Sequence, residues 1–332
     1  MNVGMWWKAL RVIPRIDKAE WQRLDVVARW LISTRAAVLL MTFFSAALAG
    51  LFALRDGQFN GGRWALLALG LVFAHATNNL VNDFTDYKRG VDKDNYFRTQ
   101  YGPQPIEQGL MTQREMFAYI AFSAVIAIAA GVPLVIFGGT TALLLMAAGA
   151  VFVLFYTWPL KYIGLGEISV VLIWGPLMVG GGYFVITGAW NWYVTLASLA
   201  YALGPTTVLF GKHIDKLASD QAKKIRTLPV ILGEKAARYS VMGMIIAMYA
   251  VVVYLVITGF FSPFLLVVLL ALRTLPRVWA MYRNPKPAER PADYDPNAWP
   301  LWFSAMSFYH NRQFGALLIL GVDLEKDEDI LH

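Results

Sequence analysis

Long apolar segments recur along almost the whole chain, and they constrain its fold more than any other feature. A helix needs about 20 mainly apolar residues to cross the hydrocarbon core of a bilayer. Hydrophobic residues make up 58% of the 332 positions, more than in an ordinary soluble domain. We therefore expect an all-α polytopic membrane protein with nine transmembrane helices, at about 28–53, 63–82, 115–137, 139–158, 167–187, 193–211, 238–259, 260–281 and 300–321.

The same pattern predicts a single membrane-embedded domain over residues 1–332. Residues 1–27 are mixed and charged, and their stretch MWWKALRVIPRI combines Trp with Lys and Arg, as in a cytoplasmic or interfacial segment. They hold no apolar core of about 7–15 residues, so we expect no cleavable signal peptide. Residues 28–321 would form the nine-helix bundle, and residues 322–332 a short acidic tail.

The positive charges predict how the chain is oriented in the membrane. Numbering the connections alternately places 24 of the 29 Lys and Arg residues on one side, at 1–29, 83–114, 159–166, 212–238 and 273–299. The opposite side holds only Arg55, Arg63 and Lys326. Because Lys and Arg concentrate in cytoplasmic loops, we expect the N-terminus inside and the C-terminus outside. The net charge of +7 then reflects orientation, and we expect no nucleic-acid partner.

The residue types also exclude two kinds of site. The chain has no Cys, which rules out disulfides and thiolate metal sites. Its four His are scattered without the spacing of zinc ligands. A structural zinc site is therefore not expected.

The stretch NNLVNDFTDYKRGVD, residues 78–92, brings three carboxylates to the end of the second apolar segment. Within it, Asn79, Asn82, Asp83 and Asp86 follow the spacing i, i+3, i+4 and i+7, so they share one helix face. Carboxylates crowded this closely repel one another unless a cation lies between them. Polar groups inside a membrane segment are costly and mark a function by default. We therefore expect a cation site here, in a cluster that also includes Asp92.

A second acidic cluster follows the sixth apolar segment, in the stretch GKHIDKLASDQAKKIRTLP at residues 211–229. It contains Asp215 and Asp220. The positions of the two clusters, after the second and the sixth segments, indicate a duplicated four-helix unit. Folded face to face, the clusters would form one acidic chamber at the cytoplasmic boundary of the membrane. The alternative for the second cluster is a solvated loop that closes a helix pair.

Carboxylates with interleaved Asn suit Mg²⁺, a hard ion that binds through carboxylates and substrate phosphates. Basic residues flank both clusters: Lys88, Arg89, Lys212, Lys216, Lys223, Lys224 and Arg226. This mixture fits a Mg²⁺–diphosphate complex, in which cations neutralise the remaining phosphate charge. We expect Asn79, Lys88, Arg89, Lys212, Lys216 and Arg226 to contact the diphosphate.

A diphosphate beside an apolar bundle implies a substrate with a lipid tail. If the diphosphate leaves, an allylic carbocation develops, and aromatic faces would stabilise it. The candidates for this contact with the prenyl group or the acceptor are Tyr156, Tyr162 and Trp174, with Trp158 and Tyr183 as further candidates.

These features resemble the UbiA superfamily of intramembrane prenyltransferases, and most of all its 1,4-dihydroxy-2-naphthoate polyprenyltransferases of menaquinone synthesis. The likeness lies in NDFTDYKRGVD, YGPQPIEQGLMTQREM, YTWPLKYIGLGEISVVLIWGPLMVGGGYF and SDQAKKIRTLPVILGEKAAR, which span most of residues 78–238. The D-x2-D-x5-D spacing is similar to the naphthoate type. The resemblance implies a nine-helix bundle around a central cavity open to lipid. It also implies that Asn82, Asp83 and Asp86 bind Mg²⁺–diphosphate, with Asp92 nearby, and that Asp215 and Asp220 serve a second metal ion.

The second cluster departs from that family's pattern. Where the naphthoate enzymes usually read N-N-x-R-D, this chain reads KHIDK, with Lys216 at the expected Asp position and Asp215 one residue earlier. In a regular helix Asp215 and Asp220 would point roughly 140° apart, and only Asp215 would face the chamber. If the helix ends or bulges before Ser219, both carboxylates can converge. We favour the second case, because Asp220 keeps its spacing to the matched TLPVILG.

The sequence thus predicts a Mg²⁺-dependent polyprenyl-diphosphate:aromatic acceptor prenyltransferase with membrane lipid around it. The rival within the fold is a terpene cyclase, which needs no acceptor. A transporter or lipid-binding protein is the rival from another class, but transporters place ionisable groups near the midplane and not on one face.

Other polar residues lie within apolar segments without an assigned role. They are Arg35 in the first segment and His310, Asn311 and Arg312 in the ninth. An Arg in hydrocarbon faces a partner or water, so a structural ion pair and a substrate contact are both open for Arg35. His75, one turn before Asn79, fits a hydrogen-bonded helix histidine better than a catalytic one.

Overall fold

The computed structural model describes residues 1–91, 93, 102–296 and 298–325. All regular secondary structure in those ranges is helical, which confirms the all-α prediction. Seven of the described helices are long and apolar enough to cross a membrane, so the chain is an integral membrane protein with several spans. The chain divides into two compact units. Unit 1 comprises Met1–Ala47 and Gly61–Pro159, and unit 2 comprises Leu48–Asn60 and Leu160–His332.

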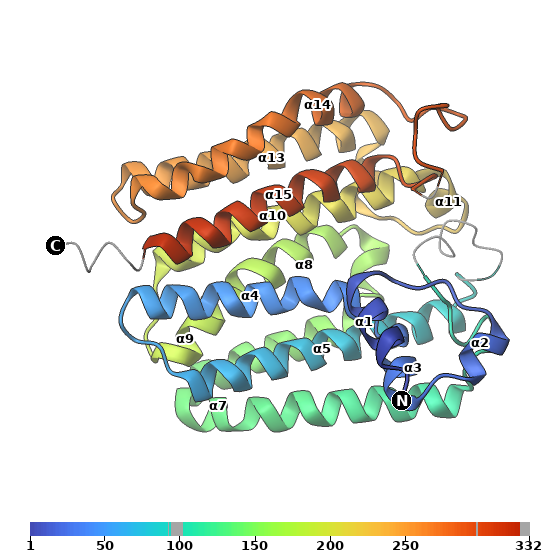
Figure 1. The fold of residues 1–332 in the computed structure, drawn as a ribbon, viewed down its shortest axis with the longest axis horizontal. Helices are drawn as coiled ribbons and strands as arrows, with labels where there is room; N and C mark the ends of the chain where they lie inside the picture. Colours follow the sequence, from blue (N-terminus) through green and yellow to red (C-terminus); the bar gives the residue numbers. More distant parts are fainter. Residues whose placement is uncertain (92, 94–101, 297, 326–332) are drawn as a thin grey trace. The chain divides into compact units, whose positions relative to one another are not determined.

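Unit 1 contains three short helices followed by three long ones. These are α1 (Val3–Arg11), α2 (Lys18–Gln22), α3 (Val26–Ser33), the first part of α4 (Ala36–Arg55), α5 (Gly61–Lys88) and α7 (Gln113–Phe155). α5 and α7 pack against each other (Figure 1). The carboxylates of Asp17 and Asp25 accept hydrogen bonds from the first turns of α2 and α3, which explains where these helices begin.

Asp25 also ties α1 to α3. Its carboxylate accepts hydrogen bonds from the Ala28 N–H at 2.8 Å, from the Trp6 indole at 2.9 Å and from the Asn2 N–H. Partial burial would raise the pKa of Asp25, but the hydrogen bonds outweigh it and lower this pKa to about 2. The N-terminal segment therefore has a defined position within unit 1.

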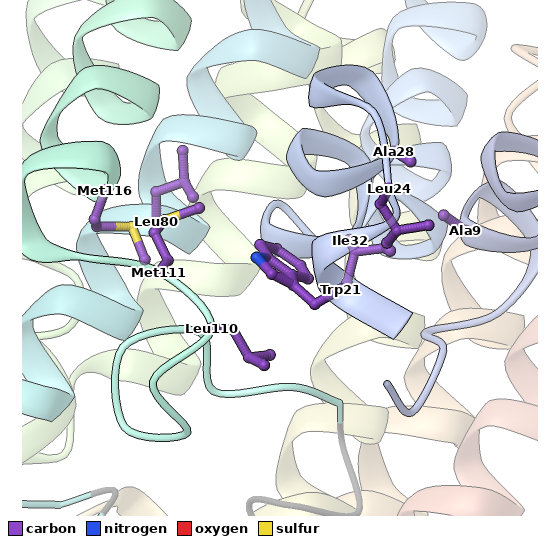
Figure 2. Close-up of a cluster of buried hydrophobic side chains, with 9 residues drawn as sticks. All are labelled: Ala9, Trp21, Leu24, Ala28, Ile32, Leu80, Leu110, Met111 and Met116. Atoms are coloured by element: carbon purple, nitrogen blue, oxygen red, sulfur yellow. The ribbon is translucent and has the colours of Figure 1, made fainter. Parts of the chain in front are cut away.

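A buried hydrophobic cluster fixes these short helices to α5 and α7. Figure 2 shows Trp21 of α2, Leu24 of the connection to α3 and Ile32 of α3 on one side of it, and Leu80 and Met116 on the other. The whole cluster consists of Ala9, Trp21, Leu24, Ala28, Ile32, Leu80, Leu110, Met111 and Met116. The segment predicted to be interfacial thus packs on the long helices through its apolar residues.

The expected first span, 28–53, is not one helix. α3 ends at Ser33 and α4 begins at Ala36. Arg35, between them, has a φ of 55°, a left-handed conformation that is uncommon for a residue with a Cβ. The prediction of an uninterrupted helix was wrong, because the turn directs the Arg35 side chain to Asp83 of α5.

α7 covers two of the expected spans, 115–137 and 139–158. A straight helix of its 43 residues would be about twice as long as the hydrocarbon core is thick. Gly139 interrupts it with a φ of 57° and a ψ of −143°, values that only glycine adopts without strain. The segment is therefore two helices joined at Gly139.

Unit 2 is built around α10 (Trp192–Asp215), which packs against α13 (Glu234–Ile257), α15 (Phe303–Glu325) and the π-helical turn η2 (Ile173–Gly180). Figure 1 shows α10 and α15 running side by side. The remaining elements are η1 (Leu160–Ile163), α8 (Gly166–Leu172), α9 (Gly181–Thr187), α11 (Leu217–Ala222), α12 (Leu228–Leu232), η3 (Pro263–Thr274) and α14 (Leu275–Arg283).

Glycines allow α10 and α15 to approach closely. A Cβ on Gly211 would lie 2.7 Å from the backbone of Phe303 and Ser304, and a Cβ on Gly204 would meet the Asn311 side chain. Small residues at such contacts are typical of helix packing in membranes. The contact at Gly211 brings the end of α10 against the start of α15, and this determines the partners of Asp215.

Candidate active site

The first acidic cluster lies on α5, which continues through it without a break to Lys88. Asp83 and Asp86 are one helical turn apart and buried, with exposed fractions of 4% and 6%. Asn79 is also buried, and Asn82 is half-buried on the same face. The structure therefore brings together the four side chains that the spacing placed on one face. Asp92 lies outside the described residues.

Arg35 supplies a positive charge to this face. Its guanidinium forms an ion pair with Asp83, and the same Nη2 lies 3.5 Å from Oδ1 of Asn82. The Asn79 amide donates to the Thr34 carbonyl at 2.8 Å, which holds the turn between α3 and α4 on α5. A role for Arg35 as an ion-pair partner is thus observed, although sequence reasoning could not name the carboxylate.

The end of α7 holds the other side of the α5 face. Asn82 donates to the Thr157 hydroxyl at 2.8 Å, and Asn78 donates to the Val153 carbonyl at 2.9 Å. Lys88 and Arg89 are exposed just beyond the carboxylates, where the Arg89 guanidinium lies 5.2 Å from the Trp158 ring. Both cations therefore remain accessible at the end of α5.

The second acidic cluster has a different local structure. α10 ends at Asp215, Lys216 has a non-helical φ and ψ of −117° and 20°, and α11 begins at Leu217. This confirms the prediction that the helix ends before Ser219. The convergence of Asp215 and Asp220 on one metal ion stays a prediction, and each carboxylate has a partner of its own in the structure.

Asp215 caps the start of α15. Its carboxylate accepts hydrogen bonds from the Phe303 N–H at 2.9 Å, the Ser304 N–H at 3.0 Å and the Ser304 hydroxyl at 2.8 Å. The Lys286 ammonium lies 3.9 Å from the same carboxylate and donates to the Pro300 carbonyl at 2.5 Å. Burial lowers the pKa of Lys286, and the Asp215 carboxylate partly offsets this shift.

Asp220 is paired with the lysine at the helix break. The Lys216 ammonium lies 2.9 Å from Asp220 Oδ1, across one turn of α11. Asp220 is 2% exposed, and its Oδ2 is buried without a hydrogen-bond partner in the described part of the chain. Of the other predicted diphosphate contacts, Lys212 is half-buried and Arg226 is exposed.

The sequence analysis missed a buried contact between a histidine and a glutamate in this unit. His213 Nδ1 contacts Glu167 Oε1, and Glu167 Oε2 accepts from the Leu228 N–H at 3.2 Å. Both side chains are almost fully buried. The sequence could have indicated this contact, because Glu167 lies in an apolar stretch and an intramembrane carboxylate is functional by default.

The aromatic candidates divide between the units. Tyr156 and Trp158 follow α7 in unit 1, whereas Tyr162 of η1 and Trp174 of η2 belong to unit 2. Tyr183 donates to Asp56 at 2.7 Å, which gives its hydroxyl a structural contact. The cation-stabilising role of these rings stays a prediction.

Two histidines among the other intramembrane polar residues have hydrogen-bond partners. His75 Nδ1 lies 2.7 Å from the Thr42 hydroxyl, as expected for a hydrogen-bonded histidine. His310 Nδ1 lies 2.6 Å from the Thr274 hydroxyl, and His310 Nε2 lies 3.5 Å from the Tyr249 hydroxyl. Arg312 is exposed on α15.

The donor set on α5 fits Mg²⁺. It consists of carboxylates and amides, whose oxygens are the hard ligands this ion prefers. Within the described residues no three His, Asp or Glu side chains gather closely enough to hold an ion alone. Mg²⁺ commonly binds through one or two carboxylates and completes its coordination with substrate phosphate and water. Asp83 and Asp86 supply that minimal set.

Comparisons with known proteins identify the family of this chain. The model of the UbiA prenyltransferase family matches residues 42–305. The 1,4-dihydroxy-2-naphthoate octaprenyltransferase of Escherichia coli (strain K12) is 29% identical over 229 residues, covering 65% of this chain and 72% of that protein.

Two solved structures share the fold. The apo structure of a UbiA homologue from Aeropyrum pernix K1 is similar with a TM-score of 0.64 at 19% identity, over 88% of this chain and 98% of that one. A UbiA homologue from Archaeoglobus fulgidus, bound to GPP and Mg²⁺, is similar with a TM-score of 0.58 at 16% identity, over 87% and 99% of the two chains. These likenesses confirm a UbiA-like helical fold.

Proposed function

The chain belongs to the UbiA prenyltransferase family, whose model matches residues 42–305, and we propose that it transfers a polyprenyl group from a prenyl diphosphate to an aromatic, naphthoate-like acceptor in the membrane. The observation that carries this proposal is the buried face of α5, where Asp83 and Asp86 lie one turn apart within a membrane helix. The diphosphate of a lipid-tailed substrate accounts for carboxylates at the end of an apolar helix.

Asp83 and Asp86 would hold Mg²⁺, with Asn79 and Asn82 beside them. When bound, Mg²⁺ supplies the positive charge that lets the diphosphate depart as a leaving group. Arg35 forms an ion pair with Asp83 and would share this carboxylate with the ion, which fixes the orientation of Asp83. Lys88 and Arg89 would neutralise the outer phosphate oxygens, and Tyr156 would offer a ring to the developing allylic cation.

The proposed acceptor rests on one relative and on the spacing of the first acidic cluster. The E. coli relative is named for a naphthoate acceptor, and the spacing of Asp83, Asp86 and Asp92 is of the naphthoate type. A homologous structure holds GPP and Mg²⁺, which supports the proposed donor and cofactor. We infer that the product is a prenylated aromatic lipid of the quinone class.

The finer membrane arrangement is also a proposal. We infer nine crossings, because α7 contains two helices joined at Gly139 and because α15 is long enough to span. The charge distribution supports a cytoplasmic N-terminus and a cytoplasmic location for the loops after α5 and α10. The expectation that both acidic clusters face one chamber stays a prediction.

A terpene cyclase is the second candidate function. It is supported by Lys216, which stands in the second cluster where the naphthoate enzymes usually have Asp. Purified protein incubated with a prenyl diphosphate and Mg²⁺ separates the alternatives. We expect no conversion until a dihydroxynaphthoate is added, and then a prenylated product. A cyclised hydrocarbon or alcohol formed without acceptor would identify a cyclase. No conversion under any condition would reject both enzymes.

A further inference from the structure

In the second acidic cluster each aspartate has a partner of its own. We propose that this cluster binds a phosphate group through the Lys216 ammonium, and that it holds no second Mg²⁺ between Asp215 and Asp220. The proposal rests on the proposed function, in which the substrate is a diphosphate. It follows from the partners of the two carboxylates, from the helix break and from the local charge.

Asp215 caps the N-terminus of α15. Three donors at 2.8–3.0 Å occupy both of its oxygens at the start of α15, and its side chain is fully buried there. Its role as an α15 cap explains why Gly211 lies against the same backbone, since a Cβ would separate the two helices. A metal ion could recruit Asp215 only by removing the cap from a buried helix terminus, which is costly. Asp215 is therefore a positioning residue.

Asp220 is also unsuited to a divalent ion. The Lys216 ammonium lies 2.9 Å from its Oδ1, and its Oδ2 is buried. Asp83 also pairs with a cation, but it has the carboxylate of Asp86 beside it on the same helix face. Asp220 has no such neighbour, because the other aspartate of its cluster is held by the start of α15. Asp220 instead holds the lysine in one orientation.

Lys216 is well placed to bind an anion. An ammonium has three donors, of which Asp220 takes one, and the side chain is 14% exposed, so part of it can reach a ligand. The helix break at Lys216 allows this geometry, because α11 starts at the next residue and carries Asp220 one turn on. A fixed ammonium can therefore meet a phosphate oxygen without prior binding of metal.

The charge around the cluster points the same way. Residues 212–226 carry five Lys and Arg against two Asp, a net charge of +3. Residues 79–93 around the first cluster carry three Lys and Arg against three Asp, a net charge of zero. A region with excess positive charge attracts phosphate and disfavours a second divalent cation. The two clusters thus have complementary chemistry.

The first test measures the binding of inorganic diphosphate to the purified full chain in detergent with EDTA, by titration calorimetry. We expect Lys216→Gln to weaken binding at least about tenfold, which corresponds to about 1.4 kcal/mol. Lys216→Arg should stay within about threefold of the unmodified protein, and Lys235→Gln, an exposed lysine on α13, should match it. Unchanged binding by Lys216→Gln, or no binding by the unmodified protein without metal, would overturn the proposal.

The second test counts Mn²⁺ ions by electron paramagnetic resonance at saturating inorganic diphosphate. We expect one ion per chain, retained in Asp220→Asn and lost in Asp83→Asn. Two ions per chain, one of them lost in Asp220→Asn, would overturn the proposal while leaving prenyl transfer intact. If no ion bound in any variant, the metal of the proposed function would be rejected, and the calorimetric result would still decide the role of Lys216.

Discussion

The acidic clusters of α5 and of α10–α11 begin with similar sequence features but differ in how the backbone presents them. α5 continues through its cluster, so Asp83 and Asp86 lie on one face. α10 stops at Asp215, and Asp220 lies on α11, five residues further on. The spacing of the aspartates and the partners that each one meets therefore decide whether they can act as a pair. A count of aspartates in each loop would not distinguish the two clusters.

The partners of the carboxylates differ in the same way. In unit 1 the partner is Arg35, which a turn between two helices brings to Asp83. In unit 2 Asp215 binds the backbone of α15, and Asp220 of α11 binds Lys216 at the helix break. The first cluster keeps a second buried carboxylate, Asp86, on the same face, and we infer that only this cluster is a metal site.

We propose that both clusters face the cytoplasm. Labelling of single-Cys variants tests this location with an all-or-none outcome. The chain has no Cys, so single-Cys variants can be labelled with an impermeant maleimide. His332→Cys should react in intact cells, whereas Arg89→Cys and Lys223→Cys should react only after lysis. If Lys223→Cys reacted in intact cells and Arg89→Cys did not, the two clusters would lie on opposite sides of the membrane, and this proposal would be wrong.

The largest graded effect is expected in the α5 cluster. Asp83→Asn and Asp86→Asn should each lower prenyl transfer at least about 1,000-fold, a barrier change of about 4 kcal/mol, because each removes an ionised ligand. EDTA should abolish turnover, and added Mg²⁺ should restore it. Asp293→Asn, in an exposed loop, is the matched control and should keep its activity. Full activity of either α5 variant would remove this cluster from the site.

A smaller effect is expected in the second cluster, with different signatures for its two aspartates. Asp220→Ala should lower turnover at least about tenfold, because Lys216 loses the partner that orients it. Asp215→Ala should lower turnover to a similar extent and also destabilise the fold by about 1–2 kcal/mol, because α15 loses its cap. Unfolding followed by Trp fluorescence separates them. Equal stability of the two variants would argue against the capping role.

The smallest effect concerns the support of the α5 face. Thr157→Val removes the hydroxyl that accepts the hydrogen bond from Asn82. We expect a loss of about 0.5–1.5 kcal/mol in stability and less than tenfold in turnover, since Asn82 keeps its place on the helix. Equilibrium unfolding and the transfer assay measure both. A loss as large as that of Asp83→Asn would mean that Asn82 is itself essential.

Local spacing explains what could be predicted from the sequence. The helical period placed Asn79, Asn82, Asp83 and Asp86 on one face, and the structure keeps them there. The spacing between Asp220 and TLPVILG likewise predicted that α10 ends before Ser219. These features depend on residues a few positions apart, so a single sequence is sufficient to read them.

The partners of the site residues could not be predicted, because tertiary packing selects them. Arg35 lies in what reads as one long apolar segment, and nothing in that segment signals the turn that directs it to Asp83. The residues around Asp215 in the sequence indicate a metal ligand. In the structure its carboxylate accepts a hydrogen bond from the start of α15, 88 residues later. An ionised side chain does not reveal from sequence whether a cation, a helix terminus or a substrate will satisfy it.

The Mg²⁺ dependence of prenyl transfer tests the contrast between the clusters most directly. Asp83→Glu and Asp220→Glu both keep a carboxylate but displace it, so each variant should retain measurable turnover. We predict that Asp83→Glu raises the half-saturating Mg²⁺ concentration at least about tenfold, whereas Asp220→Glu lowers turnover and leaves that concentration unchanged. An equal rise in both variants would show that the two clusters share the metal and would contradict the account.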